Sequence, residues 1–240
     1  IYGFVVNSSG DKSLATIING TKGKTLLEQG DLDGAIEAYK QYVKLNPSNA
    51  DAHNNLGIAY TKKNKPDEAI IEVKEAIRLS PDSMDFHENL ANICLNQGKL
   101  DEAEETFEEM LRINPDYQTK NILNALNIIY SKKGMYDKII ENCRWLIGIE
   151  PADIDSRNNL AAACYEKGLY GEAKLQVNRI LEIDSNNTKA QELLKKLKTT
   201  EAEEVSEKKQ AAFIRDGSST PPIFIKFPLQ ETEARADEYN

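Results

Sequence analysis

Three prolines, Pro47, Pro81 and Pro115, stand 34 residues apart, and each closes a segment with apolar residues at helical spacing. An alanine recurs at one fixed distance before each of them, within the segments DGAIEAY, DEAIIEV and DEAEETF. A constant period of this length is typical of repeat proteins, in which each unit buries its apolar surface against its neighbours. The chain of 240 residues is therefore expected to form a stacked array rather than one globular core.

The period extends over five units, although it is not perfectly regular. Pro151 follows Pro115 after 36 residues, which places a two-residue insertion near 117–120, and Ser185 takes the place of the proline in the last unit. Turn residues such as Gly98 divide each unit into two amphipathic stretches, so each unit is predicted to be a helical hairpin. The predicted units are 16–49, 50–83, 84–117, 118–153 and 154–187, followed by a capping helix at 188–200.

This pattern resembles the tetratricopeptide repeat over about residues 16–200. The matching small residues and prolines are Gly23, Gly57, Ala91 and Ala161, then Ala35, Ala69, Ala103 and Ala173, then Pro47, Pro81, Pro115 and Pro151. The resemblance implies an all-α fold, a right-handed α-solenoid whose first helices line a concave groove. Unit 4 departs from the pattern, because Asn127 and Ile139 replace small residues, and we expect its packing and groove shape to differ.

The groove implied by the resemblance is rich in amide side chains. The candidate partner-binding residues are Asn54, Asn55, Glu88, Asn89, Asn92, Asn121, Asn124, Asn158 and Asn159. Asparagine both donates and accepts hydrogen bonds, so such an array could hold the backbone of an extended peptide. The alternative interpretation is that Asn55, Asn89 and Asn159 only tie one helix of the wall to the next.

The resemblance implies a binding protein, and two versions of that function remain open. In the first, the chain is a protein–protein interaction scaffold that binds a peptide or helix of one or more partner proteins in the groove. In the alternative, it is a permanent accessory or assembly subunit of a larger complex, membrane-attached or not, tethered by its non-repeat termini. Relatives that bind chaperone C-terminal tails need Lys or Arg on three successive first helices. Those places hold other residues here, which argues against chaperone tails as partners: Gly20, Asp85, Asn89, Asn121 and Ala125.

Other classes of function find no support in the sequence. The formal net charge is −9, whereas nucleic-acid binding requires a basic stripe. No phosphate loop, nucleophile elbow or dinucleotide motif is present, so we expect no catalytic residues and no cofactor. His53 and His87 are 34 residues apart and take equivalent places in two units, which favours a packing or groove-edge role over a metal site. The cysteines Cys94, Cys143 and Cys164 are interpreted as core residues, and the single tryptophan, Trp145, as a core residue or, in the alternative, a partner contact.

The two ends lie outside the repeat. Residues 1–15 are predicted to be an extension, and the apolar stretch 1–6 could be the remnant of a signal or anchor, so a cytoplasmic and a periplasmic or membrane-associated location both stay open. No stretch has the roughly 20 apolar residues that a bilayer span needs. Residues 201–240 form an acidic, proline-containing tail. Its apolar segment 223–229 is predicted to dock on this chain or on a partner, through Ile223, Phe224, Ile225, Phe227 and Leu229.

Overall fold

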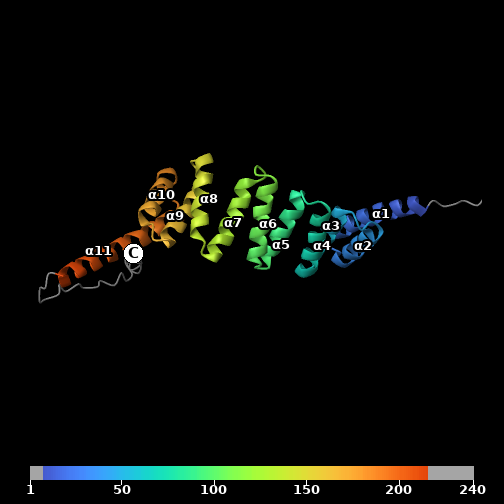
Figure 1. Ribbon diagram of the computed structural model, residues 1–240, viewed down its shortest axis with the longest axis horizontal. Helices are drawn as coiled ribbons and strands as arrows, with labels where there is room; N and C mark the ends of the chain where they lie inside the picture. The colour runs from blue at the N-terminus through green and yellow to red at the C-terminus, as the bar shows by residue number, and fades with distance from the viewer. Residues whose placement is uncertain (1–7, 216–240) are drawn as a thin grey trace, which may run out of the picture.

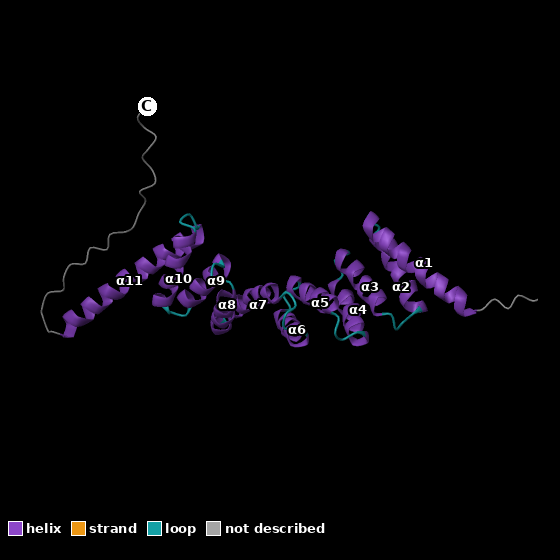
Figure 2. Ribbon diagram, turned by 90° about the horizontal axis from the view of Figure 1, so that it is seen from above, coloured by secondary structure: helices purple, strands orange, loops and turns teal. Residues whose placement is uncertain are grey.

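The computed structural model describes residues 8–215, with side chains over 14–211. Eleven α-helices follow one another over the described part, and they succeed each other along the long axis of the molecule (Figure 1). They are α1 (Ser8–Gln29), α2 (Leu32–Leu45), α3 (Ala50–Lys62), α4 (Pro66–Leu79), α5 (Met84–Asn96), α6 (Leu100–Ile113), α7 (Thr119–Lys133), α8 (Tyr136–Ile149), α9 (Ile154–Glu166), α10 (Tyr170–Ile183) and α11 (Thr188–Arg215). Figure 2 shows the same succession from above, with α1 and α11 at opposite ends.

Each predicted unit is a helical hairpin, from α1 with α2 to α9 with α10. The turns between paired helices need a left-handed residue, and glycine adopts that conformation without steric cost. Gly98 ends α5 in this way with φ +69°, and Asn64 takes the same role after α3 with φ +57°. Side-chain caps start several helices, as where Asn49 Oδ1 accepts a 2.7 Å hydrogen bond from the Ala52 amide of α3.

The hairpins stack so that one continuous core runs through the array. A leucine of each first helix from α3 to α9 lies in it and is at most 7% exposed: Leu56, Leu90, Leu126 and Leu160. Small residues let paired helices approach closely. At Gly57, an added Cβ would lie 2.5 Å from Val73 Cγ2, which shows that α3 and α4 leave no room for a methyl group. The prediction of an all-α solenoid of stacked helix-turn-helix units is confirmed.

Unit 4 differs from its neighbours where the sequence departs from the pattern. Asn127 and Ile139 lie between α7 and α8, and these two helices pack less closely than those of the other hairpins. The insertion ahead of α7 holds Gln118 in a left-handed conformation with φ +42°. We attribute the looser packing of unit 4 to these larger side chains, because small residues hold the other hairpins together.

Exposed ion pairs join successive units along two lines. On the first line, an aspartate in the first turn of a second helix pairs with a lysine of the next unit: Asp33–Lys63, Asp67–Lys99, Asp101–Lys133 and Asp137–Lys167. On the second line, the pairs are Lys74–Glu102 at 2.8 Å, Glu108–Lys138 at 3.2 Å and Arg144–Glu172 at 2.7 Å. The middle pair of the second line has the opposite polarity. Each exposed pair contributes only about 0.2–1 kcal/mol. The two lines of ion pairs therefore add little stability, and their main effect is on which units can stack next to each other.

The structure differs from the predictions at the ends of the repeat and at Trp145. The helix α1 begins at Ser8 and runs across the predicted boundary at residue 16, and α11 continues past Thr200 to Arg215. The predicted docking segment 223–229 and the apolar residues 1–6 lie outside the described residues. Trp145, predicted to be core, is 49% exposed on α8, because its neighbour Leu146 takes the buried place. Among the helices of residues 8–215, none combines the length and the apolar character of a bilayer span.

Candidate functional site

The first-helix wall is the surface formed by α1, α3, α5, α7 and α9, on which the candidate residues were predicted. Two of these residues bind each other. Asn89 Nδ2 donates a 2.9 Å hydrogen bond to Asn54 Oδ1, and Asn54 is only 7% exposed. This pair ties α5 to α3, which is the structural role that the sequence left open for Asn89. The side chains of Asn54 and Asn89 thus use this donor and this acceptor within the protein and cannot offer them to a partner at the same time.

The insertion before α7 engages two further candidates. The hydroxyl of Tyr117 donates a 3.4 Å hydrogen bond to Glu88, and burial, with Glu88 adding to it, raises the pKa of Tyr117. Asn121 Nδ2 donates to Gln118 Oε1 at 3.1 Å and is exposed. The middle of the wall is therefore closed by contacts of the protein with itself.

The remaining amides are free of protein partners within the described residues. Asn55 and Asn158 are half-buried, whereas Asn92 on α5 and Asn159 on α9 are exposed. The Oδ1 atom of Asn124 is buried without any hydrogen-bond partner. In repeat register, Asn124 and Asn159 are the counterparts of Asn54 and Asn89, yet no hydrogen bond joins them. A buried amide oxygen without a partner is costly, at about 1–3 kcal/mol, so a ligand donor there would be favourable.

A hollow of about 600 Å³ opens on the wall between α7 and α9, with α8 as its floor. Its lining includes Asn127, Ile128, Tyr136, Ile139, Asn159 and Ala162. Ile128 is 56% exposed and provides an apolar contact, while Asn159 provides an amide. Asn127 and Ile139, the irregular residues of unit 4, are both part of this lining. A 3.0 Å hydrogen bond from Asn142 holds Asn127 to α8.

A second hollow of about 660 Å³ lies near the other end of the wall, between α1 and α3 with α2 as its floor. Its lining includes Ile17, Gly20, Tyr42, Asp51 and Asn55. A Cβ at Gly20 would lie 2.8 Å from the Tyr42 ring, so the glycine makes room for this aromatic side chain. The three equivalent amides Asn55, Asn89 and Asn159 thus have different roles. The first and third face hollows, and the middle one ties two helices.

The cysteine and histidine side chains are buried in the core. The three cysteines, Cys94, Cys143 and Cys164, are fully buried, and burial raises the pKa of Cys143 to about 12 and that of Cys164 to about 11. A thiol held protonated at neutral pH is a poor nucleophile and a poor metal ligand. These residues are core residues, as predicted. His53 and His87 are also buried, at 7% and 6% exposure, as the packing interpretation predicts.

Comparisons with known proteins agree with this geometry. A family model described as tetratricopeptide repeat matches residues 21–83 and 64–117. A search of curated protein sequences found no match. Among solved structures, a MamA protein is 27% identical with a TM-score of 0.61, over 73% of this chain and 94% of that one.

Two structures with lower sequence identity are similar to this chain in fold alone. A tetratricopeptide repeat protein from Parabacteroides merdae is 18% identical with a TM-score of 0.64, over 86% of this chain and 81% of its own. YrrB, described as a tetratricopeptide-repeat protein with an unusual peptide-binding site, is 17% identical with a TM-score of 0.59, over 72% and 88%.

These comparisons identify no catalytic domain, and proteins of this repeat family are typically non-catalytic scaffolds. The 34-residue period, the stacked hairpins with glycine-ended helices, and the family match all lead to the same assignment. The chain is a tetratricopeptide-repeat protein.

Proposed function

We propose that this protein is an interaction scaffold that binds an extended segment or helix of a partner protein along its first-helix wall. Tetratricopeptide repeats generally mediate binding to proteins or peptides, and their curved stacks present extended surfaces. The observation that carries the proposal is the hollow between α7 and α9, where the exposed Ile128 adjoins the unpartnered amide of Asn159. An apolar anchor beside a free amide is the combination that recognises one side chain and the backbone of a peptide.

The two hollows suggest how a partner would lie. The tied pair Asn54 and Asn89 keeps the middle of the wall rigid, and each hollow offers one free amide, Asn55 or Asn159. A partner segment would be anchored at both ends, with its apolar side chains in the hollows and its backbone against the amides. The lysine and arginine residues of a carboxylate clamp are missing from this surface, so backbone contacts rather than chaperone carboxylates supply the polar binding.

The test uses a matched pair of exposed aliphatic residues. Ile128 on α7 is 56% exposed and Leu175 on α10 is 53% exposed, so replacing either by Asp adds one charge at a similar surface. The partner is first isolated from the native source by affinity purification and identified by mass spectrometry, and its affinity is then measured by calorimetry. We expect Ile128→Asp to weaken binding by about tenfold or more, and Asn159→Ala by less, because a desolvated anchor contributes more than one amide. Binding that is lost in Leu175→Asp and kept in Ile128→Asp would place the interface elsewhere.

A second candidate function is the permanent accessory subunit of a larger assembly. The observation that favours it is an apolar stripe on α1, where Leu14, Ile17 and Ile18 are 59%, 62% and 54% exposed at helical spacing. Obligate interfaces are more apolar than transient ones. A complex of fixed stoichiometry that survives high salt and dissociates when Leu14 and Ile18 are replaced by Ser would support this second function.

A further inference from the structure

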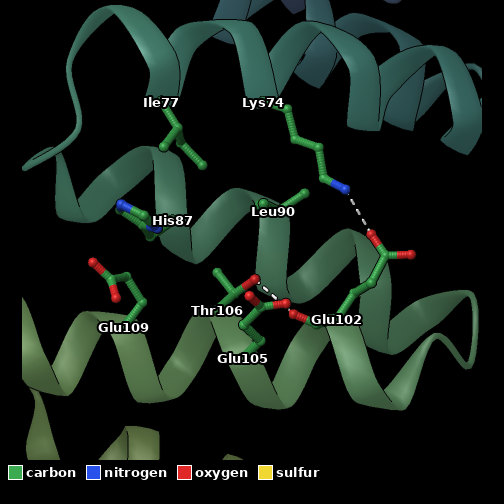
Figure 3. Close-up of a pocket in the computed structure, with 8 residues that line it drawn as sticks. All are labelled: Lys74, Ile77, His87, Leu90, Glu102, Glu105, Thr106 and Glu109. Carbon is green, nitrogen blue, oxygen red and sulfur yellow. Dashed lines mark hydrogen bonds and ion pairs between the residues drawn. The ribbon is translucent and has the colours of Figure 1, made fainter.

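A pocket of about 320 Å³ opens on the side of the solenoid formed by the second helices, between α4 and α6 with α5 behind it (Figure 3). Ile77 and Leu90 provide its apolar lining, and His87 lies at one end of it, near Glu109. The volume is at the lower end of the roughly 300–1,000 Å³ typical of ligand pockets, so it suits one side chain rather than a large ligand. None of the groove candidates takes part in this pocket.

The ring of His87 is held in place by one of its nitrogens only. Its Nε2 lies 2.8 Å from the carbonyl oxygen of Pro81, and the side chain is 6% exposed. Because a carbonyl oxygen can only accept, Nε2 must donate, and in the neutral ring Nδ1 is then an acceptor. Within residues 8–215, Nδ1 has no partner. His87 therefore presents an acceptor without a protein partner to the pocket that it lines.

Units 2 and 5 fill the same place with a longer side chain. In unit 2, His53 Nδ1 lies 2.7 Å from Glu72 Oε2, while Nε2 lies near the Pro47 carbonyl oxygen. In unit 5, Arg157 donates to Gln176 Oε1 at 2.7 Å. In units 2 and 5, a side chain of the second helix therefore hydrogen-bonds a side chain of the first helix and links the two helices of the hairpin.

Unit 3 has Thr106 at the position of Glu72 and Gln176. Its side chain is shorter, and its hydroxyl donates to the carbonyl oxygen of Glu102 in its own helix at 2.7 Å. Thr106 therefore offers nothing to His87 and leaves space beside the ring. The pocket is the direct result of this replacement, because the glutamate of unit 2 would occupy it.

The charges around the pocket define what it can bind. The Lys74 ammonium is engaged by Glu102 at 2.8 Å, and Glu109 is engaged by a neighbouring arginine, whose hydrogen bond lowers the pKa of this carboxyl. Glu105 is exposed and has no ion pair within the described part of the chain. The donors of the pocket are thus already used. The groups that remain, His87 Nδ1 and the Glu105 carboxylate, are both acceptors.

We propose that this pocket binds the side chain of an arginine from a partner protein. A guanidinium carries five donors in a planar fork, which can serve His87 Nδ1 and the Glu105 carboxylate together. The methylene stem would pack against Ile77 and Leu90, as long basic side chains do on apolar surfaces. The pocket faces away from the first-helix wall, so this contact does not depend on the groove and would let the scaffold hold two partners at once.

The test exploits the fact that the chain has only two histidines. The full chain, labelled with ¹⁵N-histidine, is titrated at about pH 7.5 with acetyl-Gly-Arg-Gly-amide and, separately, with the same peptide carrying uncharged citrulline. The Nδ1 resonance of His87 is expected to shift and saturate with the arginine peptide only. His53, whose nitrogens are both engaged, is the internal control and is expected to stay unchanged.

Variants distinguish binding of the arginine peptide in the pocket from its general attraction to an acidic protein surface. Thr106→Glu rebuilds the contact seen at His53 and is expected to weaken binding about tenfold, and Glu105→Ile, which copies Ile71 of unit 2, about threefold. Glu141→Ile makes the same surface change at the equivalent place of unit 4 and is expected to leave the affinity unchanged. Circular dichroism checks that each variant is folded. Equal responses of both histidines, equal binding of the citrulline peptide, or full affinity in folded Thr106→Glu and Glu105→Ile would overturn the proposal.

Discussion

The hydrogen bond between Asn54 and Asn89 leads to a prediction that separates a structural amide from a free one. Asn89 and Asn159 occupy equivalent places in units 3 and 5, but only Asn89 has a protein partner among the described residues. Replacing Asn89 by Ala leaves the oxygen of Asn54, which is 7% exposed, without its donor, at a cost of about 1–3 kcal/mol. Replacing Asn159 by Ala breaks no such bond. Both changes gain the same helix propensity, so the difference between their free energies of unfolding should be about 1–3 kcal/mol.

The measurement is urea unfolding of the two variants and the unaltered chain, followed by circular dichroism and by fluorescence of Trp145. Repeat arrays can unfold in parts, and this single tryptophan reports on α8 while circular dichroism reports on all helices. Free energies are compared only where both probes give the same transition, and otherwise hydrogen exchange in α3 and α5 replaces them. Equal stability of the Asn89→Ala and Asn159→Ala variants would refute the reasoning, because it would mean that the hydrogen bond contributes nothing.

Three further predictions concern stability. Gly57→Ala is expected to be about 1–3 kcal/mol less stable than Gly148→Ala, because a Cβ at Gly57 would meet a buried valine at 2.5 Å whereas one at Gly148 meets open space; thermal unfolding measures the difference. Burial raises the pKa of Cys143 from 9.0 to about 12, and burial, together with Glu108, raises that of Tyr130 from 10.0 to about 12. The folded state keeps protons that the unfolded state loses, and stability should fall between about pH 9 and 12 in a urea series across pH; constant stability over that range would contradict this. Asp153→Ala removes the cap of α9, in which Asp153 Oδ1 accepts from the backbone amides of Asp155 at 3.1 Å and Ser156 at 3.4 Å, and should cost about 0.5–2 kcal/mol by the same unfolding assay. An unchanged midpoint would show the cap to be dispensable.

The architecture was predictable because the repeat period is visible in the sequence. Pro47 and its successors give the register, and glycines such as Gly98 mark the turns that the structure confirms. The same register identified Asn127 and Ile139 as irregular, and these residues line the hollow between α7 and α9. A repeated pattern predicts fold well because each unit contacts only its neighbours.

The pairing of individual side chains was not predictable. Whether Asn89 reaches Asn54 depends on the spacing of two helices, and the wider unit 4 breaks the equivalent contact without any change at Asn159 itself. For Trp145, the repeat register predicts more than the residue type does. Its counterparts in register are the charged residues Glu109 and Arg179, which predict an exposed place. The core interpretation of Trp145 was wrong, because the residue is 49% exposed.

Thr106 shows a different limit of the sequence. The sequence shows that units 2 and 5 carry a longer polar residue at this place, Glu72 and Gln176. Only the structure reveals that these residues hydrogen-bond His53 and Arg157 of the first helices, and that the shorter Thr106 leaves a pocket beside His87.

The reversed ion pair between units 3 and 4 restricts how such a chain can gain or lose units. Excising unit 3 alone would set Lys74 against Lys138 where it now meets Glu102, and excising unit 4 alone would set Glu108 against Glu172. Excising both brings Lys74 to Glu172, and attraction is restored. To keep this line of ion pairs attractive, units 3 and 4 must therefore be deleted or duplicated together.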